Sequence, residues 1–342
     1  MLAPDFAQSF QTLLLIAADD GRRDLLFGDS LERAWEVVPP FLVGNRFPDV
    51  YLEHPLSGDP FLDVTVLLQD VEPRTRIDSP LAGEHGALLD WYASIDRCGG
   101  SVDLGFEVDT GAESVPEAAV HFQPRQHLEY VRPFCEAAGE PDRADLYLDL
   151  ASRMPKAWSL SFFGMFRGRP ASPLRVCGYL SPEEKAACAT DPVRLAATFD
   201  RIGFSAYDEA MLEQVTTLLS AAPPLADFQF DVLPDGSIGD TFAIDVSFGV
   251  ERPSAVAESF ASGVGARTMG LLESWGAADA RWRDAARSAF ARAIDVEASD
   301  GSSARLALTV MPQWAKVRWR ECELQGSKLY HSAGARLFSP RS

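Results

Sequence analysis

Hydrophobic and polar residues alternate in five pairs of short segments along the chain, and each pair is joined by a turn-forming sequence. The clearest pair is DFQFDVLPDGSIGDTFAIDVSF, in which Phe228 and Phe230 alternate with Gln229 and Asp231 before a central Asp-Gly turn. Strand side chains point alternately to opposite faces, so each segment predicts a strand with one apolar and one polar face. The predicted hairpins comprise residues 49–53 and 61–69, 102–109 and 119–123, 158–166 and 174–180, 227–232 and 242–248, and 305–311 continuing into 314–321 with 327–332.

Segments with helical spacing of apolar residues lie before and between these hairpins. They comprise residues 2–17, 30–38, 85–95, 126–136, 143–152, 181–187, 192–201, 207–220, 254–262, 266–275 and 278–293. Their apolar faces need a partner, and the apolar strand faces provide one. We therefore predict an α+β fold in one domain, residues 1–342: a ten-stranded antiparallel β-barrel with a polar lumen, surrounded by a ring of helices. An open sheet with one face towards solvent is the alternative, but it leaves long strand edges to protect.

The polar strand faces carry the candidate functional residues. In a closed barrel these side chains line a water-filled lumen: Tyr51, Glu53, Asp63, Thr65, Asp103, Glu107, His121, Gln123, Arg175, Tyr179, Gln229, Asp231, Asp245 and Ser247. In the central hairpin, Trp158, Leu160 and Phe162 are predicted to share the opposite, apolar face.

Composition and charge restrict the classes of function. Fifty acidic and 31 basic side chains give a formal net charge of −19, which argues against a binder of duplex nucleic acid, because such a protein needs a cationic face. No apolar run approaches the roughly 20 residues of a membrane span, so we expect no membrane partner. The histidines and cysteines lack metal-ligand spacing, and five widely separated cysteines predict reduced thiols in a cytoplasmic protein.

Three short stretches carry a resemblance to a known family. They are SFFGM at 161–165 followed by PLRVCGYL at 173–180, Trp314 upstream of SKLYH at 327–331, and the strand that contains Glu53. Together with the predicted helix-ringed barrel, they resemble the aromatic prenyltransferase barrels of the αββα-repeat (ABBA) superfamily, and the cyanobactin-type peptide prenyltransferases most closely. This resemblance implies transfer of a prenyl group from a prenyl diphosphate to an aromatic or peptide acceptor in the lumen, without a metal or cofactor, in peptide natural-product biosynthesis.

The chemistry implied by this resemblance assigns roles to individual residues. A diphosphate needs several Arg or Lys donors, aromatic rings shield the allylic cation, and a carboxylate takes the proton from the acceptor. The family alternates its cations and tyrosines, typically as K-x-Y, on the second strand of successive hairpins. The matching residues here are Glu53 as the base, and His121, Arg175, Tyr179, Lys328 and Tyr330 for the diphosphate and the allyl group. A solvated carboxylate at the end of its strand is the alternative for Glu53.

Acidic residues at lumen positions depart from the family pattern. Asp63 and Asp245 stand where the resemblance leads us to expect cations, and Glu107 and Asp231 add further lumen acids. Such a lumen would repel a diphosphate and attract a basic peptide. The alternating cations at 316, 318 and 320 would compensate, unless they form a solvated edge face. A non-catalytic peptide-binding protein with the same barrel is therefore the alternative function.

Overall fold

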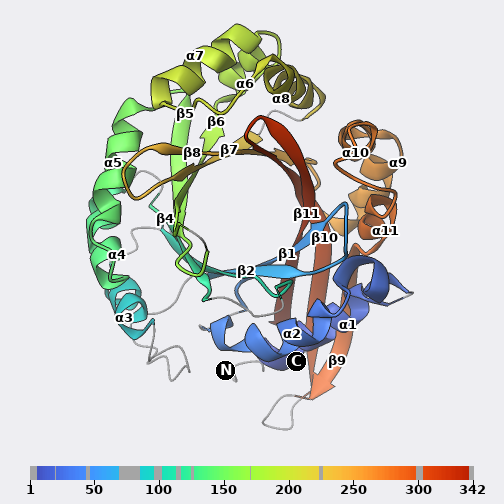
Figure 1. Cartoon of the computed structure of the whole chain (residues 1–342). Coiled ribbons are helices and arrows are strands. Elements are labelled where there is room, and N and C mark those ends of the chain that lie inside the picture. The colour runs from blue at the N-terminus through green and yellow to red at the C-terminus, as the bar shows by residue number, and fades with distance from the viewer. Residues whose placement is uncertain are drawn as a thin grey trace.

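Ten antiparallel strands close into a barrel in the computed structural model of this chain, as predicted (Figure 1). The strands follow chain order around the barrel, and β11 closes it by pairing with both β10 and β1, which excludes the open sheet. The barrel strands are β1 (Asp49–Pro55), β2 (Asp63–Leu68), β3 (Asp103–Val108), β4 (Ala119–Gln123), β5 (Trp158–Met165), β6 (Leu174–Leu180), β7 (Ala226–Val232), β8 (Ile238–Ser247), β10 (Ser303–Arg320) and β11 (Glu323–Phe338). The structure describes residues 6–19, 21–43, 47–68, 85–95, 102–112, 117–124, 127–169, 171–222, 226–297 and 303–338.

Helices surround the outside of the barrel (Figure 1). They are α1 (Phe6–Ala17), α2 (Ser30–Val37), α3 (Gly86–Ser94), α4 (Val131–Ala137), α5 (Arg143–Arg153), α6 (Pro182–Cys188), α7 (Pro192–Ile202), α8 (Glu209–Ala221), α9 (Val256–Ser262), α10 (Val264–Ser274) and α11 (Trp282–Arg287). Three of them begin at side chains that accept hydrogen bonds from the first free N–H groups: Ser181 for α6, Asp191 for α7 and Asp208 for α8. Within the described ranges, no helix is long and apolar enough to cross a membrane.

The apolar strand faces pack against the helices, and this interface is the main hydrophobic core. Phe122 of β4 stacks on Phe134 of α4 with ring centroids 4.5 Å apart, and Phe242 of β8 meets Phe199 of α7 at 4.9 Å. Burying each such side chain stabilises the fold by about 1.5–3 kcal/mol. Because the helices hold the apolar faces outward, the polar faces of the same strands must point into the lumen.

Phe162 lies on the face opposite to the one predicted. The pairing of β5 with β6 shifts register between Leu160 and Phe162. Trp158 packs outside the barrel against Phe199 and Phe228, whereas Phe162 lines the lumen. The prediction that Trp158, Leu160 and Phe162 share one face is wrong, because a bulge adds one residue to the strand and reverses the faces beyond it.

An additional strand, β9 (Phe290–Glu297), lies outside the barrel and pairs with the first half of β10. The helix predicted over 278–293 is therefore wrong in its second half, since α11 ends at Arg287. Phe290, Ile294 and Val296 are half-buried and alternate with exposed residues, which is the spacing of a strand. The alanines between them favoured a helix, but pairing with β10 overrides that preference.

The last hairpin turns earlier than predicted. β10 ends at Arg320 and β11 begins at Glu323, so Glu321 and Cys322 form the turn, with φ angles of 50° and 67°. The predicted Gln-Gly turn at Gly326 instead lies inside β11. The pairing shifts register between Arg318 and Trp319, so that Gln325 has no partner on β10 and the predicted turn residues fit within the strand.

Two histidines are buried between the barrel and the helices. His54 of β1 and His331 of β11 have ring centroids 5.1 Å apart, and each is at most 1% exposed. The Nδ1–H group of His54 donates to the carbonyl of Leu26, and the Nε2–H group of His331 donates to the carbonyl of Ala285. Burial lowers the pKa of His54 to about 3 and that of His331 to about 4.

We expect the protein to lose stability steeply on mild acidification because of these histidines. The pKa values of the two histidines are lower in the folded than in the unfolded protein, so the unfolded state binds more protons as the pH falls. Their contribution to the free energy of unfolding is therefore complete above about pH 6.5 and is lost below it. His331→Gln keeps a donor for Ala285 and should lose about 2 kcal/mol less than the parent between pH 7 and pH 5. Urea unfolding at both pH values measures this difference. His127→Gln, at a less buried site, is the control, and equal losses in the parent and His331→Gln would contradict the expectation.

Candidate functional site

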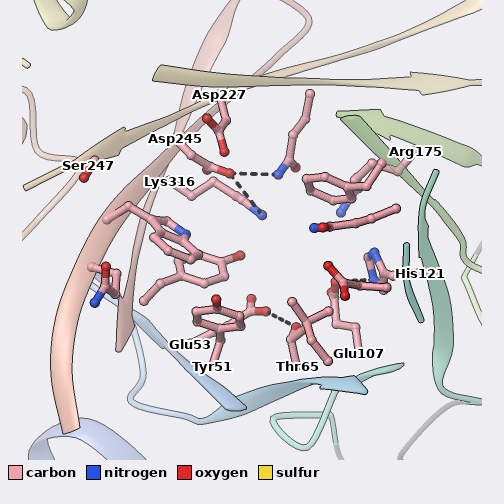
Figure 2. Close-up of a pocket in the computed structure, with 18 of the residues that line it drawn as sticks. Tyr51, Glu53, Thr65, Glu107, His121, Arg175, Asp227, Asp245, Ser247 and Lys316 are labelled. Atoms are coloured by element: carbon pink, nitrogen blue, oxygen red, sulfur yellow. Dashed lines mark hydrogen bonds and ion pairs between the residues drawn. The ribbon is translucent and has the colours of Figure 1, made fainter. Parts of the chain in front are cut away.

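A cavity of about 360 Å³ occupies the barrel lumen, within the roughly 300–1,000 Å³ usual for small-molecule sites (Figure 2). Every barrel strand contributes to its lining. The lining side chains are Tyr51, Glu53, Thr65, Leu67, Asp103, Glu107, His121, Gln123, Phe162, Arg175, Tyr179, Asp227, Gln229, Asp245, Ser247, Gln313, Trp314, Lys316 and Tyr330. The predicted polar lumen therefore exists, and it contains acids, cations and aromatic rings together.

The two ends of the lumen differ in their chain connections. The strand registers place all five hairpin turns at one end, which we call the turn end. At the other end, the helix end, strands β2, β4, β6 and β8 lead towards the outer helices. Residues near the turn end are therefore those close to the hairpin turns, such as Arg175, Asp231 and Lys328, whereas Tyr51, Asp227 and Ser247 lie near the helix end.

Ion pairs fill one side of the turn end. The guanidinium of Arg175 donates two hydrogen bonds to Asp231, at 2.9 and 3.2 Å. Arg169 donates to Glu107 at 2.6 Å, and His121 Nε2 lies 3.1 Å from the other oxygen of that carboxylate. Burial opposes the ionisation of Glu107, but Arg169 and His121 outweigh it and hold its pKa well below the usual value. The two arginines and the two carboxylates of this cluster therefore compensate one another's charge.

Lys328 joins two acids on the neighbouring strands. Its ammonium lies 2.8 Å from Asp63 and 3.3 Å from Glu53, and the hydroxyl of Thr65 donates to the second oxygen of Glu53 at 2.8 Å. Burial raises the pKa of Asp63, and Lys328 only partly offsets that effect. Glu53, at 1% exposed, is therefore a carboxylate held by donors on two strands, and the alternative of a solvated strand end is wrong.

Arg318 differs from these cations because it has neither a hydrogen bond nor an ion pair among the residues that the structure describes. Burial and the nearby Arg175 lower its pKa. With Lys316 and Lys328 it lines a hollow of about 150 Å³ at the turn end, so it does not belong to a solvated edge face. Lys316 and Lys328 stand directly opposite each other across β10 and β11. Like charges in this arrangement are destabilising unless an anion lies between them.

Three rings form an aromatic wall on one side of the cavity: Tyr51, Trp314 and Tyr330. The ring centroids of Tyr51 and Trp314 are 4.9 Å apart, and those of Trp314 and Tyr330 are 5.7 Å apart with nearly parallel planes. The ammonium of Lys316 lies 4.7 Å from the centroid of Tyr330. The wall therefore already holds a cation against the face of one of its rings.

Two aspartates, Asp227 and Asp245, stand opposite each other on β7 and β8 and line the cavity near its helix end. Gln229 donates to one oxygen of Asp245 at 2.9 Å, and Lys316 lies 4.0 Å from that oxygen. Burial, together with repulsion from Asp245, raises the pKa of Asp227 to about 8, and burial raises the pKa of Asp245 to about 6.

Comparisons with known proteins address the fold. No protein-family model matches the sequence, and no curated protein is similar to it. Among solved structures, 5-dimethylallyltryptophan synthase from Streptomyces coelicolor aligns over 97% of both chains at 12% identity, with a TM-score of 0.56. The apo form of the prenyltransferase PriB aligns over 98% of this chain and 99% of its own at 13% identity, with a TM-score of 0.52.

The chain has the ABBA prenyltransferase-barrel fold. The fold prediction is confirmed along nearly the whole length of both aligned structures. A closer likeness to the cyanobactin-type members remains a prediction.

Seven of the ten predicted site residues line the cavity of this ABBA barrel: Glu53, Glu107, His121, Arg175, Tyr179, Asp245 and Tyr330. The other three, Asp63, Asp231 and Lys328, do not line it, but all three form ion pairs at the turn end. Within the described ranges, no group of three or more His, Cys, Asp or Glu side chains is arranged to hold a metal.

Sequence reasoning missed several residues of the site. Phe162 was missed because its bulge leaves no sequence signature. Arg169 lies in a turn, outside any strand pattern, yet it pairs with Glu107 and Asp109. Asp227 could have been predicted from the sequence, because it shares a strand face with Gln229, and it lines the same cavity of the ABBA barrel.

Proposed function

We propose that this protein is an aromatic prenyltransferase that moves a prenyl group from a prenyl diphosphate to an aromatic side chain, either free or within a peptide. The observation that carries this proposal is the half-buried Arg318, which makes no hydrogen bond or ion pair with the described residues and lies beside Lys316 and Lys328 at the turn end. A diphosphate bears about three negative charges and takes several cationic donors, with Arg the best suited to bidentate contacts. The fold shared with two proteins named as prenyl-transferring enzymes supports the same conclusion.

The aromatic wall supplies the next requirement of the reaction. When the bond between the allylic carbon and the diphosphate breaks, positive charge develops on the prenyl group, and ring faces stabilise it by cation–π contact. Lys316 lines both the cavity and the turn-end hollow, so a diphosphate in the hollow would place its prenyl group towards the cavity. Tyr330 and Trp314 are the rings nearest that path, and Tyr51 extends the wall towards the helix end.

Glu53 is our proposed base for the proton that leaves the acceptor. It lines the cavity, and its register partner on β11 is Tyr330 of the aromatic wall. Glu53→Gln should lower kcat by about 10²- to 10⁴-fold without weakening donor binding, because the substitution removes one of the two acids that compete for Lys328. Steady-state kinetics combined with donor-analogue titration checks this expectation. A change confined to KM would indicate that Glu53 only positions a substrate.

The direct experiment is incubation of the protein with dimethylallyl diphosphate and candidate acceptors, followed by mass spectrometry. Tryptophan, tyrosine and short peptides that contain them cover the free and peptide-bound forms. We expect at least one acceptor to gain the mass of a dimethylallyl group and diphosphate to be released. Unchanged masses for every acceptor would count against the enzyme.

Non-catalytic peptide binding in the same barrel is the second candidate, and the paired cations favour it. Arg175 is already neutralised by Asp231, and Lys328 by Glu53 and Asp63, so these cations are less available to an anion. Titration with a dimethylallyl thiolodiphosphate separates the two candidates, since only the transferase binds it.

A further inference from the structure

The Asp227–Asp245 pair has less hydrogen bonding than its burial requires. Asp245 is 7% exposed, and its Oδ1 atom has no hydrogen-bond partner among the described residues. Asp227 has neither a hydrogen bond nor an ion pair within the same described ranges. Three other acids of the lumen each pair with a closer cation: Glu53 with Lys328, Glu107 with Arg169 and Asp231 with Arg175. Among the described residues the pair has one distant cation, Lys316 at 4.0 Å from Asp245, for two carboxyl groups.

The nearest cation of the chain is directed elsewhere. Lys316 approaches Asp245 only to 4.0 Å, on the oxygen that Gln229 already serves, and its ammonium lies over the ring of Tyr330. Figure 2 shows the carboxyl groups of Asp227 and Asp245 directed into the cavity, with Lys316 reaching towards its centre. Both aspartates thus belong to the cavity lining, and Asp227 is the more exposed of the two.

The surroundings of the pair fit an aromatic molecule that carries the missing charge. Trp314 pairs in register with Ser247, two residues beyond Asp245 on the same face of β8, so the aromatic wall adjoins the aspartates. Tyr51 lies against Trp314 in that wall. A ring stacked on the wall would place a short aminoalkyl substituent within reach of both carboxylates. An ammonium there gains charge-assisted hydrogen bonds and separates two like charges.

We propose that Asp227 and Asp245 bind a protonated amine, and that the acceptor of this barrel is an aromatic compound with such an amine. Calling the bound amine the acceptor rests on the proposed prenyl transfer, but the amine site itself does not. It gives the lumen two subsites of opposite charge: an anion subsite at the turn end and a cation subsite towards the helix end.

The test compares matched ligands that differ only in charge. Tryptamine, tyramine and phenethylamine are titrated calorimetrically into the full-length protein at pH 8, alongside the corresponding alcohols, which replace the ammonium with a hydroxyl group. We expect at least one amine to bind at least tenfold more tightly than its alcohol. Equal affinities in every matched pair, or no detectable binding of all three amines, would overturn the proposal.

Substitutions test whether the two aspartates cause the preference for the amine. In the double variant Asp227→Asn/Asp245→Asn, the preference for the amine should fall to about twofold or less, while the affinity for the alcohol stays the same. Asp240→Asn, which removes an acid from the same strand as Asp245 outside the cavity lining, is the matched control and should keep the preference. An amine preference that survives in the double variant, or disappears in the control, would overturn the assignment. Circular dichroism establishes that each variant is folded.

The outcome is independent of the proposed transferase activity. The amine titrations contain no prenyl donor, whereas donor binding and prenyl transfer are measured with thiolodiphosphate and dimethylallyl diphosphate. Prenyl transfer to neutral acceptors, without a preference for amines, would support the proposed transferase and contradict the amine site. Amine preference without donor binding would support the amine site and count against the transferase.

Discussion

Replacing Arg318 with methionine is expected to stabilise the free protein by on the order of 1 kcal/mol while weakening prenyl-diphosphate binding by about 10- to 100-fold. Arg318 is a half-buried cation that makes no ion pair with the described residues, and repulsion from Arg175 outweighs the attraction of Asp231. Its presence costs stability in the empty barrel, so removing the charge relieves that cost. A bound diphosphate would supply the missing counter-charge, and the same substitution therefore removes a charge-assisted contact.

Opposite changes in stability and affinity distinguish a ligand-binding arginine from a structural one. Thermal unfolding gives the stability, and calorimetric titration with dimethylallyl thiolodiphosphate gives the affinity. Arg320→Met is the matched control, because Arg320 lies on the same strand but is exposed and paired with Asp240. That control should alter neither quantity much. A less stable Arg318→Met protein with unchanged affinity would remove the main support for the anion subsite.

Arg175→Met is expected to destabilise the protein by about 3–5 kcal/mol, the largest effect of any single substitution considered. The substitution leaves Asp231 buried without its bidentate partner. Burial alone would raise the pKa of Asp231, but Arg175 reverses that effect, and the pKa lies below the usual value. Without Arg175, the carboxylate must stay charged at high cost or take up a proton.

Urea unfolding of Arg175→Met and of Arg175→Met/Asp231→Leu tests the origin of this cost. The double variant should recover most of the lost stability, because the carboxylate that lost its bidentate partner is also removed. If the double variant is as unstable as the single one, the loss comes from packing of the arginine stem against its neighbours, including Phe166, whose ring lies 4.5 Å from the guanidinium.

Alternation along the chain was sufficient to predict the barrel, because period-two patterning and the need to bury apolar faces leave few other folds. It also placed most lumen residues correctly, as with Glu107 and Arg175. It failed where one residue changes the register: the bulge that turns Phe162 inward is decided by packing across β5 and β6, not by composition.

The pairing of charges inside the lumen was not predictable from the sequence. Lys328 was expected to face a diphosphate, but the register of β1, β2 and β11 brings it against Glu53 and Asp63. Such contacts depend on which strands become neighbours in space. Conversely, Arg318 was considered only as one of three alternating cations, and its lack of an ion pair with the described residues becomes visible only once the barrel is closed.

The pairing of β1 with β11 also has a kinetic consequence. Glu53 and Lys328, which meet across this seam, are 275 positions apart in the chain. Contacts between such distant segments form slowly because a long loop must be ordered first. During synthesis, one edge of β1 stays unpaired until β11 has been made. We therefore expect refolding to be slow, and folding intermediates to associate through that edge.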